Sequence, residues 1–564
     1  MDNRMNSFEN NSSRYIGNDL IRFLGNDVLS AAPEKEPERQ HYFIAQLKAL
    51  GNPGASDAQD QSHDADVKPL TAAVVTFGCQ MNARDSEKLT GILEEAGYEM
   101  TDDEENADFV IFNTCTVREN ANEHLYGRLG RLKNMKKSHP ERIIAVCGCM
   151  MQESDEVAKL RQKYAYVDLI FGTHNLYKFP ELLFMLHRKR LGMVDSLEAV
   201  HAGNAVLTDS SADHERYEKL LRYGGNTGTQ KDLEKLYRKP VVSVWQDSGD
   251  IVEDLPQQRK FPFKQGINIM FGCNNFCSYC IVPYVRGREK SRTPGEILEE
   301  IRRAAGEGVK EIMLLGQNVN SYRGISSEES VFMSFPELLQ KVDDLAEETG
   351  IERIRFMTSH PKDLSDELIE VMAKSKHVCH QFHLPLQSGS SRILKRMNRH
   401  YDKERFLDRA ARLREAMPDI VITTDIIVGF PGESEEDFLE TLDVVEKVRF
   451  DAAFTFIYSK REGTPAASFD DQVNEADVKD RFDRLLELQN RIAAESLERF
   501  RGKTLPVLFE DVSEYDPMMI TGKLENGTTV HVAAEPEDQQ RLIGTVRQVR
   551  LEESHGFYYT GSLV

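Results

Sequence analysis

The chain has 564 residues, too many for a single hydrophobic core, and this length favours about three or four domains. Acidic residues outnumber basic ones by 93 to 71, and the formal net charge of -22 argues against a surface that binds polyanions everywhere. The mean hydropathy is -0.49, no apolar run is long enough to span a bilayer, and the first residues show no secretory pattern. We therefore expect a cytoplasmic protein with no membrane partner and eight reduced cysteines.

The N-terminal third shows a change of pattern near Thr71. Residues 1–69 combine one amphipathic stretch, 40–50, with Pro-, Asp- and Ser-rich sequence, which predicts a flexible N-terminal extension. From Thr71, short apolar runs alternate with helical stretches, as is typical of an α/β domain with an open parallel sheet, here expected over residues 70–190.

Three predicted strands of this domain, 73–77, 108–112 and 143–146, each run directly into a cysteine. The carboxyl ends of parallel strands meet at one edge of a sheet, where open α/β proteins bind ligands. Cys79 and Cys115 can therefore converge there with a third cysteine, although they lie far apart in the sequence. The spacing does not choose between Cys147 and Cys149 as that third member. The pattern predicts a three-thiolate metal site.

Residues 191–255 break the alternation and are interpreted as a linker and insertion. The next region, 256–498, contains six apolar runs separated by helical stretches, which predict a partial (β/α)6 barrel with its site at the strand carboxyl ends. The predicted strands are 267–272, 312–316, 354–357, 382–386, 425–428 and 453–458. The last region, 501–564, has short alternating strands with turn residues between them, which favour a small antiparallel, OB-like β-barrel.

The loop at the start of the predicted barrel carries Cys273, Cys277 and Cys280. A [4Fe-4S] cluster takes four cysteines, so three on one loop leave one iron open to an exchangeable ligand. A structural zinc site is the alternative, but a second C-x-x-C pair or an H-x-x-x-H partner, which would complete such a site, is absent beside the loop. The C-x-x-x-C-x-x-C spacing is typical of radical S-adenosylmethionine (SAM) enzymes.

Longer motifs connect the two cysteine trios to a known family. They are Gly78-Cys-Gln-Met-Asn82, Gly272-Cys-Asn-Asn-Phe-Cys-Ser-Tyr-Cys280, His383-Leu-Pro-Leu-Gln-Ser-Gly389 and Asp425-Ile-Ile-Val-Gly-Phe-Pro-Gly-Glu433. In these motifs and their order, residues 70–564 resemble the methylthiotransferase family of radical SAM enzymes, and most closely its MiaB branch. The resemblance implies a methylthiotransferase N-terminal domain, a radical SAM domain and a C-terminal TRAM domain.

The resemblance also implies an activity: methylthiolation of carbon 2 of N6-dimethylallyladenosine at position 37 of tRNA, next to the anticodon. A 5′-deoxyadenosyl radical from SAM removes the hydrogen at that carbon, and a second SAM methylates the inserted sulfur. The cofactors implied are SAM and two [4Fe-4S] clusters. One is catalytic and is held by Cys273, Cys277 and Cys280. The auxiliary one is held by Cys79, Cys115 and Cys149, since the third cysteine of the family pattern follows a glycine.

The partners implied are the anticodon stem-loop of tRNA, an electron donor such as flavodoxin or ferredoxin, and a sulfur donor that the sequence does not identify. The resemblance assigns an aromatic contact to the SAM adenine at Tyr279. Strand-end polar residues are further candidates for the SAM or adenine pocket: Gln317, Asn318, His383, Gln387 and Ser388. Candidates for contact with tRNA phosphates are Arg286, Arg288 and Arg399.

Three alternatives stay open. Two belong to the same family and share the chemistry: methylthiolation of threonylcarbamoyladenosine in tRNA, and of an aspartate in a small-subunit ribosomal protein. The third is an RNA-associated protein in which both cysteine sites are structural and the TRAM barrel supplies affinity.

Overall fold

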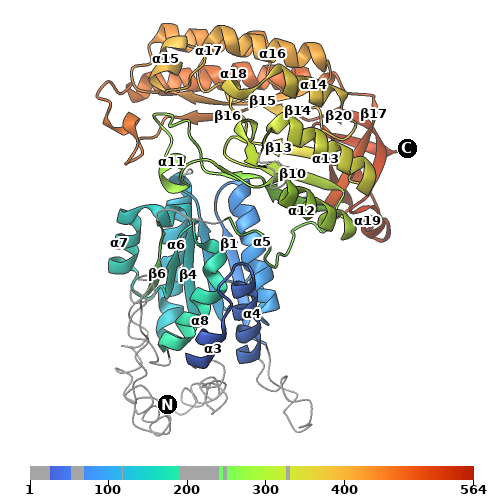
Figure 1. The fold of residues 1–564 in the computed structure, drawn as a ribbon. Coiled ribbons are helices and arrows are strands. Elements are labelled where there is room, and N and C mark those ends of the chain that lie inside the picture. Colours follow the sequence, from blue (N-terminus) through green and yellow to red (C-terminus); the bar gives the residue numbers. More distant parts are fainter. Residues whose placement is uncertain (1–25, 52–68, 117–118, 191–239, 246–250, 326–330) are drawn as a thin grey trace. The chain divides into compact units, whose positions relative to one another are not determined.

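The computed structural model describes residues 26–51, 69–116, 119–190, 240–245, 251–325 and 331–564 (Figure 1). The expectations for residues 1–25, 52–68 and 191–239 lie outside these ranges. The chain divides into two compact units, Met1–Gln258 and Arg259–Val564. Over the ranges given, none of the helices is both long enough and apolar enough to cross a membrane.

The first unit is built on a six-stranded sheet in which every neighbouring pair is parallel. Its strand order is β2-β1-β3-β4-β5-β6, so the direction of winding reverses between β1 and β3. The strands are β1 Thr71–Thr76, β2 Glu99–Met100, β3 Phe109–Thr114, β4 Ile143–Gly148, β5 Leu169–Phe171 and β6 Val241–Ser243. The predicted open parallel sheet is confirmed.

Helices cover both faces of this sheet, because the buried strands are apolar on both sides. One face packs against α4 (Glu38–Gly51), α5 (Gln80–Glu95) and α8 (Phe179–Arg190). The other packs against α6 (Glu119–Ser138) and α7 (Ser154–Lys163). Short elements complete the unit: α3 Asn26–Ala31, η3 Cys149–Gln152 and η4 Leu176–Lys178.

Two segments differ from their sequence-based interpretation. Residues 26–51, expected to be part of a flexible extension, form α3 and α4, and Phe43 and Ile44 of α4 are 0% and 1% exposed against α8 and the sheet. An ion pair from Arg39 to Glu181, at 2.6 Å, adds to this packing. Val241–Ser243, expected in a linker, supplies the sixth strand. Both segments find their partners far away in the sequence, so local composition did not reveal them.

The second unit begins with two three-stranded parallel sheets whose strands follow chain order. A parallel bridge between Ile354 and Val378 connects β13 to the segment just before β14. The strands are β7 Lys264–Asn268, β10 Glu311–Leu315, β13 Arg353–Met357, β14 Gln381–His383, β15 Val421–Val428 and β16 Ala452–Ile457. The predicted partial barrel of six β/α units is confirmed.

Helices pack outside the partial barrel and enclose one hydrophobic core with its strands (Figure 1). They are α12 Pro294–Gly306, α13 Phe335–Thr349, α14 Asp366–Lys374, α16 Lys403–Ala416, α17 Glu435–Val448 and α18 Glu475–Glu498. Short helices α11 Val282–Val285 and α15 Ser391–Arg396 lie in connecting segments, as do the antiparallel pairs β8 Met270–Phe271 with β9 Lys290–Ser291 and β11 Arg323–Ile325 with β12 Phe332–Ser334.

The C-terminal region forms the expected closed barrel, in the order β17-β18-β19-β21-β20, and its neighbouring strands are antiparallel except for the parallel pair β19 and β21. Its elements are β17 Thr504–Val512, β18 Met519–Leu524, β19 Thr529–Ala533, α19 Pro536–Leu542, β20 Val546–Ser554 and β21 Tyr558–Leu563. Alternate strand residues such as Val507, Phe509 and Val530 fill its core at 0% exposure.

A buried polar network fixes this barrel to the first residues of β7, β10 and β13. Glu311 pairs with Lys264 at 2.9 Å and with Arg355 at 3.2 Å. Arg353 donates hydrogen bonds to the carbonyl oxygens of Lys523 and Pro506 at 2.9 and 3.0 Å, and Arg355 donates to that of Leu524 at 3.1 Å. The C-terminal barrel therefore sits at the amino-terminal ends of the partial-barrel strands.

Candidate active site and metal centres

The cysteine loop of the second unit follows β8 at the carboxyl end of β7. Gly272 begins it with a φ of +72°, and a Cβ there would lie 2.1 Å from the carbonyl oxygen of Arg288. The backbone N–H of Cys273 donates to the carbonyl oxygen of Gly287 at 3.1 Å. Only a residue without a side chain fits this turn, so Gly272 sets the direction of the loop.

A second segment, which follows α15, holds the middle of the loop. Asn398 donates its side-chain amide to the carbonyl oxygens of Asn275 and Phe276, at 3.1 and 2.9 Å. The N–H of Ser278 donates to the carbonyl oxygen of Met397 at 3.0 Å. Phe276 and Asn398 both have positive φ, at 47° and 59°. The two segments brace each other, which stabilises two unfavourable backbone conformations next to the thiols.

The three thiols lie close enough together to affect one another. Burial raises the pKa of the Cys273 thiol to about 11, and Cys277 and Glu289 add to the effect. Burial also raises the pKa of Cys280 to about 12, with Cys277 contributing next. Two nitrogen donors point at the sulfur atoms: Asn275 Nδ2 lies 3.4 Å from Cys273 Sγ, and Arg399 Nη1 lies 3.4 Å from Cys277 Sγ. Neighbouring thiols with N–H donors at their sulfur atoms are typical of the surroundings of an iron–sulfur cluster. The three cysteines of the loop and the two nitrogen donors therefore fit such a cluster.

Of the three arginines expected to reach phosphates, only Arg288 is exposed. Its guanidinium lies over the ring of Phe276, 4.3 Å from the centroid. Arg286 is 8% exposed and Arg399 is 5% exposed. For Arg399 the expectation is wrong, because its side chain points into the protein towards Cys277. In a sequence, a run of basic residues is typical of an exposed surface, and only the tertiary contact shows that Arg399 is buried.

The expected pocket residues are distributed around the carboxyl ends of the strands. His383 is engaged through both ring nitrogens, with Thr423 at 3.0 Å and Asp425 at 3.3 Å. Gln387, at φ 66°, bonds through its backbone to β15, and Ser388 is fully buried with its hydroxyl accepting from the N–H of Ser390.

The remaining two polar candidates and the aromatic one lie on neighbouring elements. Asn318, after β10, is fully buried and donates to Asp363 at 2.7 Å, while Gln317 beside it is half-buried. Tyr279 is half-buried and packs on a small cluster that includes Ile393 and Phe430. The positions of these residues leave their cofactor roles as predictions.

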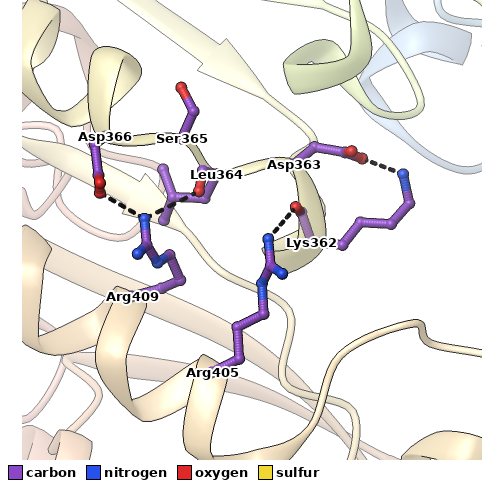
Figure 2. Close-up of a pocket in the computed structure, with 7 residues that line it drawn as sticks. All are labelled: Lys362, Asp363, Leu364, Ser365, Asp366, Arg405 and Arg409. Atoms are coloured by element: carbon purple, nitrogen blue, oxygen red, sulfur yellow. Dashed lines mark hydrogen bonds and ion pairs between the residues drawn. The ribbon is translucent and has the colours of Figure 1, made fainter.

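Asp363 also lines a surface pocket of about 450 Å³, which lies between residues 362–366 and α16 (Figure 2). Charged groups line it, and they are largely paired with one another, as Figure 2 shows. Lys362 pairs with Asp363 at 2.6 Å, and Arg409 pairs with Asp366 at 2.6 Å. Arg405 donates to the carbonyl oxygen of Lys362 at 3.0 Å. These contacts hold the charged side chains of the pocket wall against one another and against the backbone.

In the first unit, the three predicted strand-end cysteines do converge. Cys79 and Cys115 follow β1 and β3, between which the winding reverses, and this reversal is where open α/β sheets form a ligand crevice. Gly78 lies so close to Cys115 that a Cβ on it would be 2.4 Å from Cys115 Cβ. Gly148, just before Cys149, has φ +100° and packs on the carbonyl oxygen of Thr114.

Asn82 connects these strand ends, and we assigned it no role from the sequence. Its side-chain oxygen lies 3.6 Å from Cys79 Sγ and 3.9 Å from Cys149 Sγ. Its amide nitrogen donates to the carbonyl oxygens of Phe77 and Thr114, at 3.1 and 2.8 Å. The motif Gly78-Cys-Gln-Met-Asn82 contained the signal, since a fully buried amide three residues after a cysteine on the first turn of α5 must find partners nearby.

Cys147 does not join this trio. Its side chain lies in the hydrophobic core between the sheet and α5, and burial raises the pKa of its thiol well above the usual value. Across the described parts of both units, no group of three or more His, Cys, Asp or Glu side chains is arranged to hold a metal ion.

Three family models match the chain, and each falls on one of these regions. They are "Uncharacterized protein family UPF0004" over residues 71–172, "Radical SAM superfamily" over 267–445 and "TRAM domain" over 498–564. A protein of Lachnoclostridium phytofermentans named tRNA-2-methylthio-N(6)-dimethylallyladenosine synthase is 49% identical over 497 residues, which is 88% of this chain and 96% of that one. The chain belongs to this synthase family.

A second synthase of the family, from Acetivibrio thermocellus, is 48% identical over 533 residues, 94% of this chain and 97% of that one. Among solved structures, the radical SAM methyltransferase TsrM of Kitasatospora setae, with cobalamin and a [4Fe-4S] cluster bound, is 14% identical with a TM-score of 0.46. That alignment covers 70% of this chain and 74% of the other.

Proposed function

We propose that this protein methylthiolates carbon 2 of N6-dimethylallyladenosine in tRNA, at position 37 beside the anticodon. The observation that carries the proposal is the loop of Cys273, Cys277 and Cys280, with nitrogen donors at two of its sulfur atoms, in a chain that shares 49% identity with a synthase of that name. In this proposal, the functional domains are residues 70–190, 256–498 and 501–564, and residues 191–255 form a connecting segment.

The loop cysteines would hold a [4Fe-4S] cluster, which would bind SAM and supply the electron for its cleavage. The protein's own contribution is to fix and shield this site. Gly272 turns the loop, Asn398 clamps its backbone, and Asn275 and Arg399 donate to the sulfur atoms. In this proposal, the SAM and adenine pocket is lined by Tyr279, Gln317, Asn318, His383, Gln387 and Ser388.

A second [4Fe-4S] cluster is proposed at Cys79, Cys115 and Cys149, where it supplies the iron site needed for sulfur insertion. Its support is the convergence of the three strand ends at the reversal between β1 and β3. The amide oxygen of Asn82 adds to that support, since it lies 3.6 Å from Cys79 Sγ and 3.9 Å from Cys149 Sγ and so shows that these two cysteines are close together.

The proposed partners are tRNA, a low-potential one-electron donor of the flavodoxin or ferredoxin class, and a sulfur donor of unassigned identity. The TRAM match over residues 498–564 supports tRNA. So does the exposed Arg288 over Phe276 beside the cysteine loop, because bases splayed out of a loop stack on aromatic and guanidinium planes.

The test uses anaerobically reconstituted full-length protein and its triple alanine variants at each cysteine trio, with Cys379→Ala as a control outside both trios. We expect about eight iron atoms in the wild type and the control, and about four in each triple variant. SAM should change the electron paramagnetic resonance signal, except in the variant that lacks Cys273, Cys277 and Cys280.

Mass spectrometry of digested tRNA then identifies the product. With SAM, sulfide and reductant, the wild type should convert N6-dimethylallyladenosine to its 2-methylthio derivative, and both triple variants should fail to do so. Zinc in place of iron would contradict the proposal, as would conversion of threonylcarbamoyladenosine instead.

A further inference from the structure

Arg399 is a buried cation whose position beside the cysteine loop calls for an explanation. Its guanidinium donates to Cys277 Sγ at 3.4 Å, to the Tyr401 hydroxyl at 3.3 Å and to the Pro385 carbonyl oxygen at 3.1 Å. Within the described residues, Arg399 forms no ion pair with an Asp or a Glu. Its neighbours differ in this respect, because Arg392 pairs with Asp437 and Arg396 pairs with Asp471.

A guanidinium that is 5% exposed needs a negative partner, since burying an unpaired charge is costly. Tyr401 and Pro385 offer only neutral oxygen atoms at these distances. The one partner that can carry a full charge is the sulfur of Cys277, which is a thiolate when it ligates iron. When the loop holds iron, the thiolate of Cys277 therefore places a negative charge beside Arg399.

The contacts also argue against a purely structural role. The hydroxyl of Tyr401 lies 3.1 Å from the carbonyl oxygen of Pro385 and 2.7 Å from that of Leu386, and either can accept its one proton. The carbonyl group that Arg399 reaches thus has a second donor within reach when the arginine is replaced. What would be lost is the positive charge at Cys277.

We propose that Arg399 is the counter-charge of the iron–sulfur cluster on the cysteine loop, a positioning residue that retains the cluster and raises its reduction potential. This inference rests on the proposed function, which places the cluster at Cys277. Reduction adds one electron from a low-potential one-electron donor, and no proton or atom moves at Arg399. A fixed positive charge favours the more negative, reduced state.

The test compares Arg399→Met, Arg399→Gln and Arg399→Lys in the full-length reconstituted protein. The matched control is Arg412→Gln, which removes an exposed cation of α16 that pairs with Asp366 and Asp408. Three quantities are measured for each protein: iron content, the midpoint potential of the SAM-responsive paramagnetic signal, and the unfolding temperature of the iron-free form.

We expect Arg399→Met and Arg399→Gln to lower the reduced fraction of the SAM-responsive cluster about tenfold at a fixed potential, or to lose its iron. A tenfold change for one electron corresponds to ~59 mV towards more negative potential. Arg399→Lys should lie between these variants and the wild type, and Arg412→Gln should match the wild type. The iron-free Arg399→Met protein should unfold at or above the wild-type temperature, because the variant lacks a buried charge that has no Asp or Glu partner among the described residues.

Three results would overturn the inference. The first is an unchanged potential and iron content in Arg399→Met. The second is an Arg399→Lys variant as impaired as Arg399→Met, since charge would then not be the cause. The third is a drop in the unfolding temperature of the iron-free variants, which would make the role structural. A wild type with no SAM-responsive signal would instead contradict the proposed function.

Discussion

Gly272 is the residue on which the cysteine loop depends most directly. Its φ is +72°, and a Cβ at this position would lie only 2.1 Å from the Arg288 carbonyl oxygen, which leaves no room for a side chain. We expect Gly272→Ala to displace Cys273, to reduce iron content by about four atoms and to cost roughly 1–3 kcal/mol of stability. Iron analysis and thermal unfolding check this. Gly306→Ala at the end of α12 meets nothing within 4 Å and should leave the iron content unchanged, so equal losses in both variants would contradict the prediction.

Asp437 makes a second residue-level prediction, on pH dependence. Burial disfavours its charge, but hydrogen bonds from Arg392 and Ser390 outweigh burial and hold its pKa below the usual range. A carboxyl whose folded pKa is depressed adds stability above its unfolded pKa, and this stability is lost as the pH falls through the folded pKa. We expect Asp437→Asn to cost about 1–3 kcal/mol at pH 7.

The same substitution should cost less near pH 3, where the wild-type carboxylate begins to lose its advantage. Urea unfolding at the two pH values measures the difference. Asp480→Asn, at an exposed pair with Arg484, is the control and should change stability by less than ~1 kcal/mol at either pH. A loss in Asp437→Asn that does not depend on pH would show that the carboxylate charge is not the cause.

At the level of elements, the sequence predicted what depends on local periodicity. Apolar runs located β1, β3 and β4 and thus the convergence of Cys79, Cys115 and Cys149, because parallel strands end at a shared edge. The six units of the partial barrel and the C-terminal barrel followed in the same way. What it did not predict depends on contacts between distant segments: the packing of α4, the addition of β6 and the burial of Arg399. Each of these has the local composition of a surface or a linker.

The packing of α4 can be tested directly. Phe43 is fully buried against Phe184 of α8, with ring centroids 5.1 Å apart. Phe43→Ala should therefore destabilise the first unit by about 3–5 kcal/mol, whereas Lys48→Ala on the exposed face of α4 should stay within ~0.5 kcal/mol. Chemical denaturation, detected by the hydrogen exchange of backbone amides in β1 and β3, measures the free energy of unfolding of the first unit. Equal stabilities of the Phe43→Ala and Lys48→Ala variants would mean that α4 contributes little to the core.

At the scale of the second unit, Glu311 determines how firmly the C-terminal barrel is held. It lies among Lys264, Arg353 and Arg355, and it is 5% exposed. Glu311→Gln leaves these cations without their buried partner, and we expect a loss of about 3–5 kcal/mol. Limited proteolysis should then release residues 501–564. Glu370→Gln, at an exposed pair with Lys374, should have no such effect. Resistance of the Glu311 variant to proteolysis would show that apolar packing alone holds the barrel.

The position of that barrel sets a length scale for the substrate. The network contacts the first residues of β7, β10 and β13, whereas the cysteine loop follows the other end of β7. A five-residue strand spans about 17 Å. In the proposed function, an RNA bound at both ends spans at least that distance, and the second contact adds affinity only for an RNA long enough to reach both. We therefore expect the protein to bind a folded tRNA more tightly than a short fragment that carries the same base.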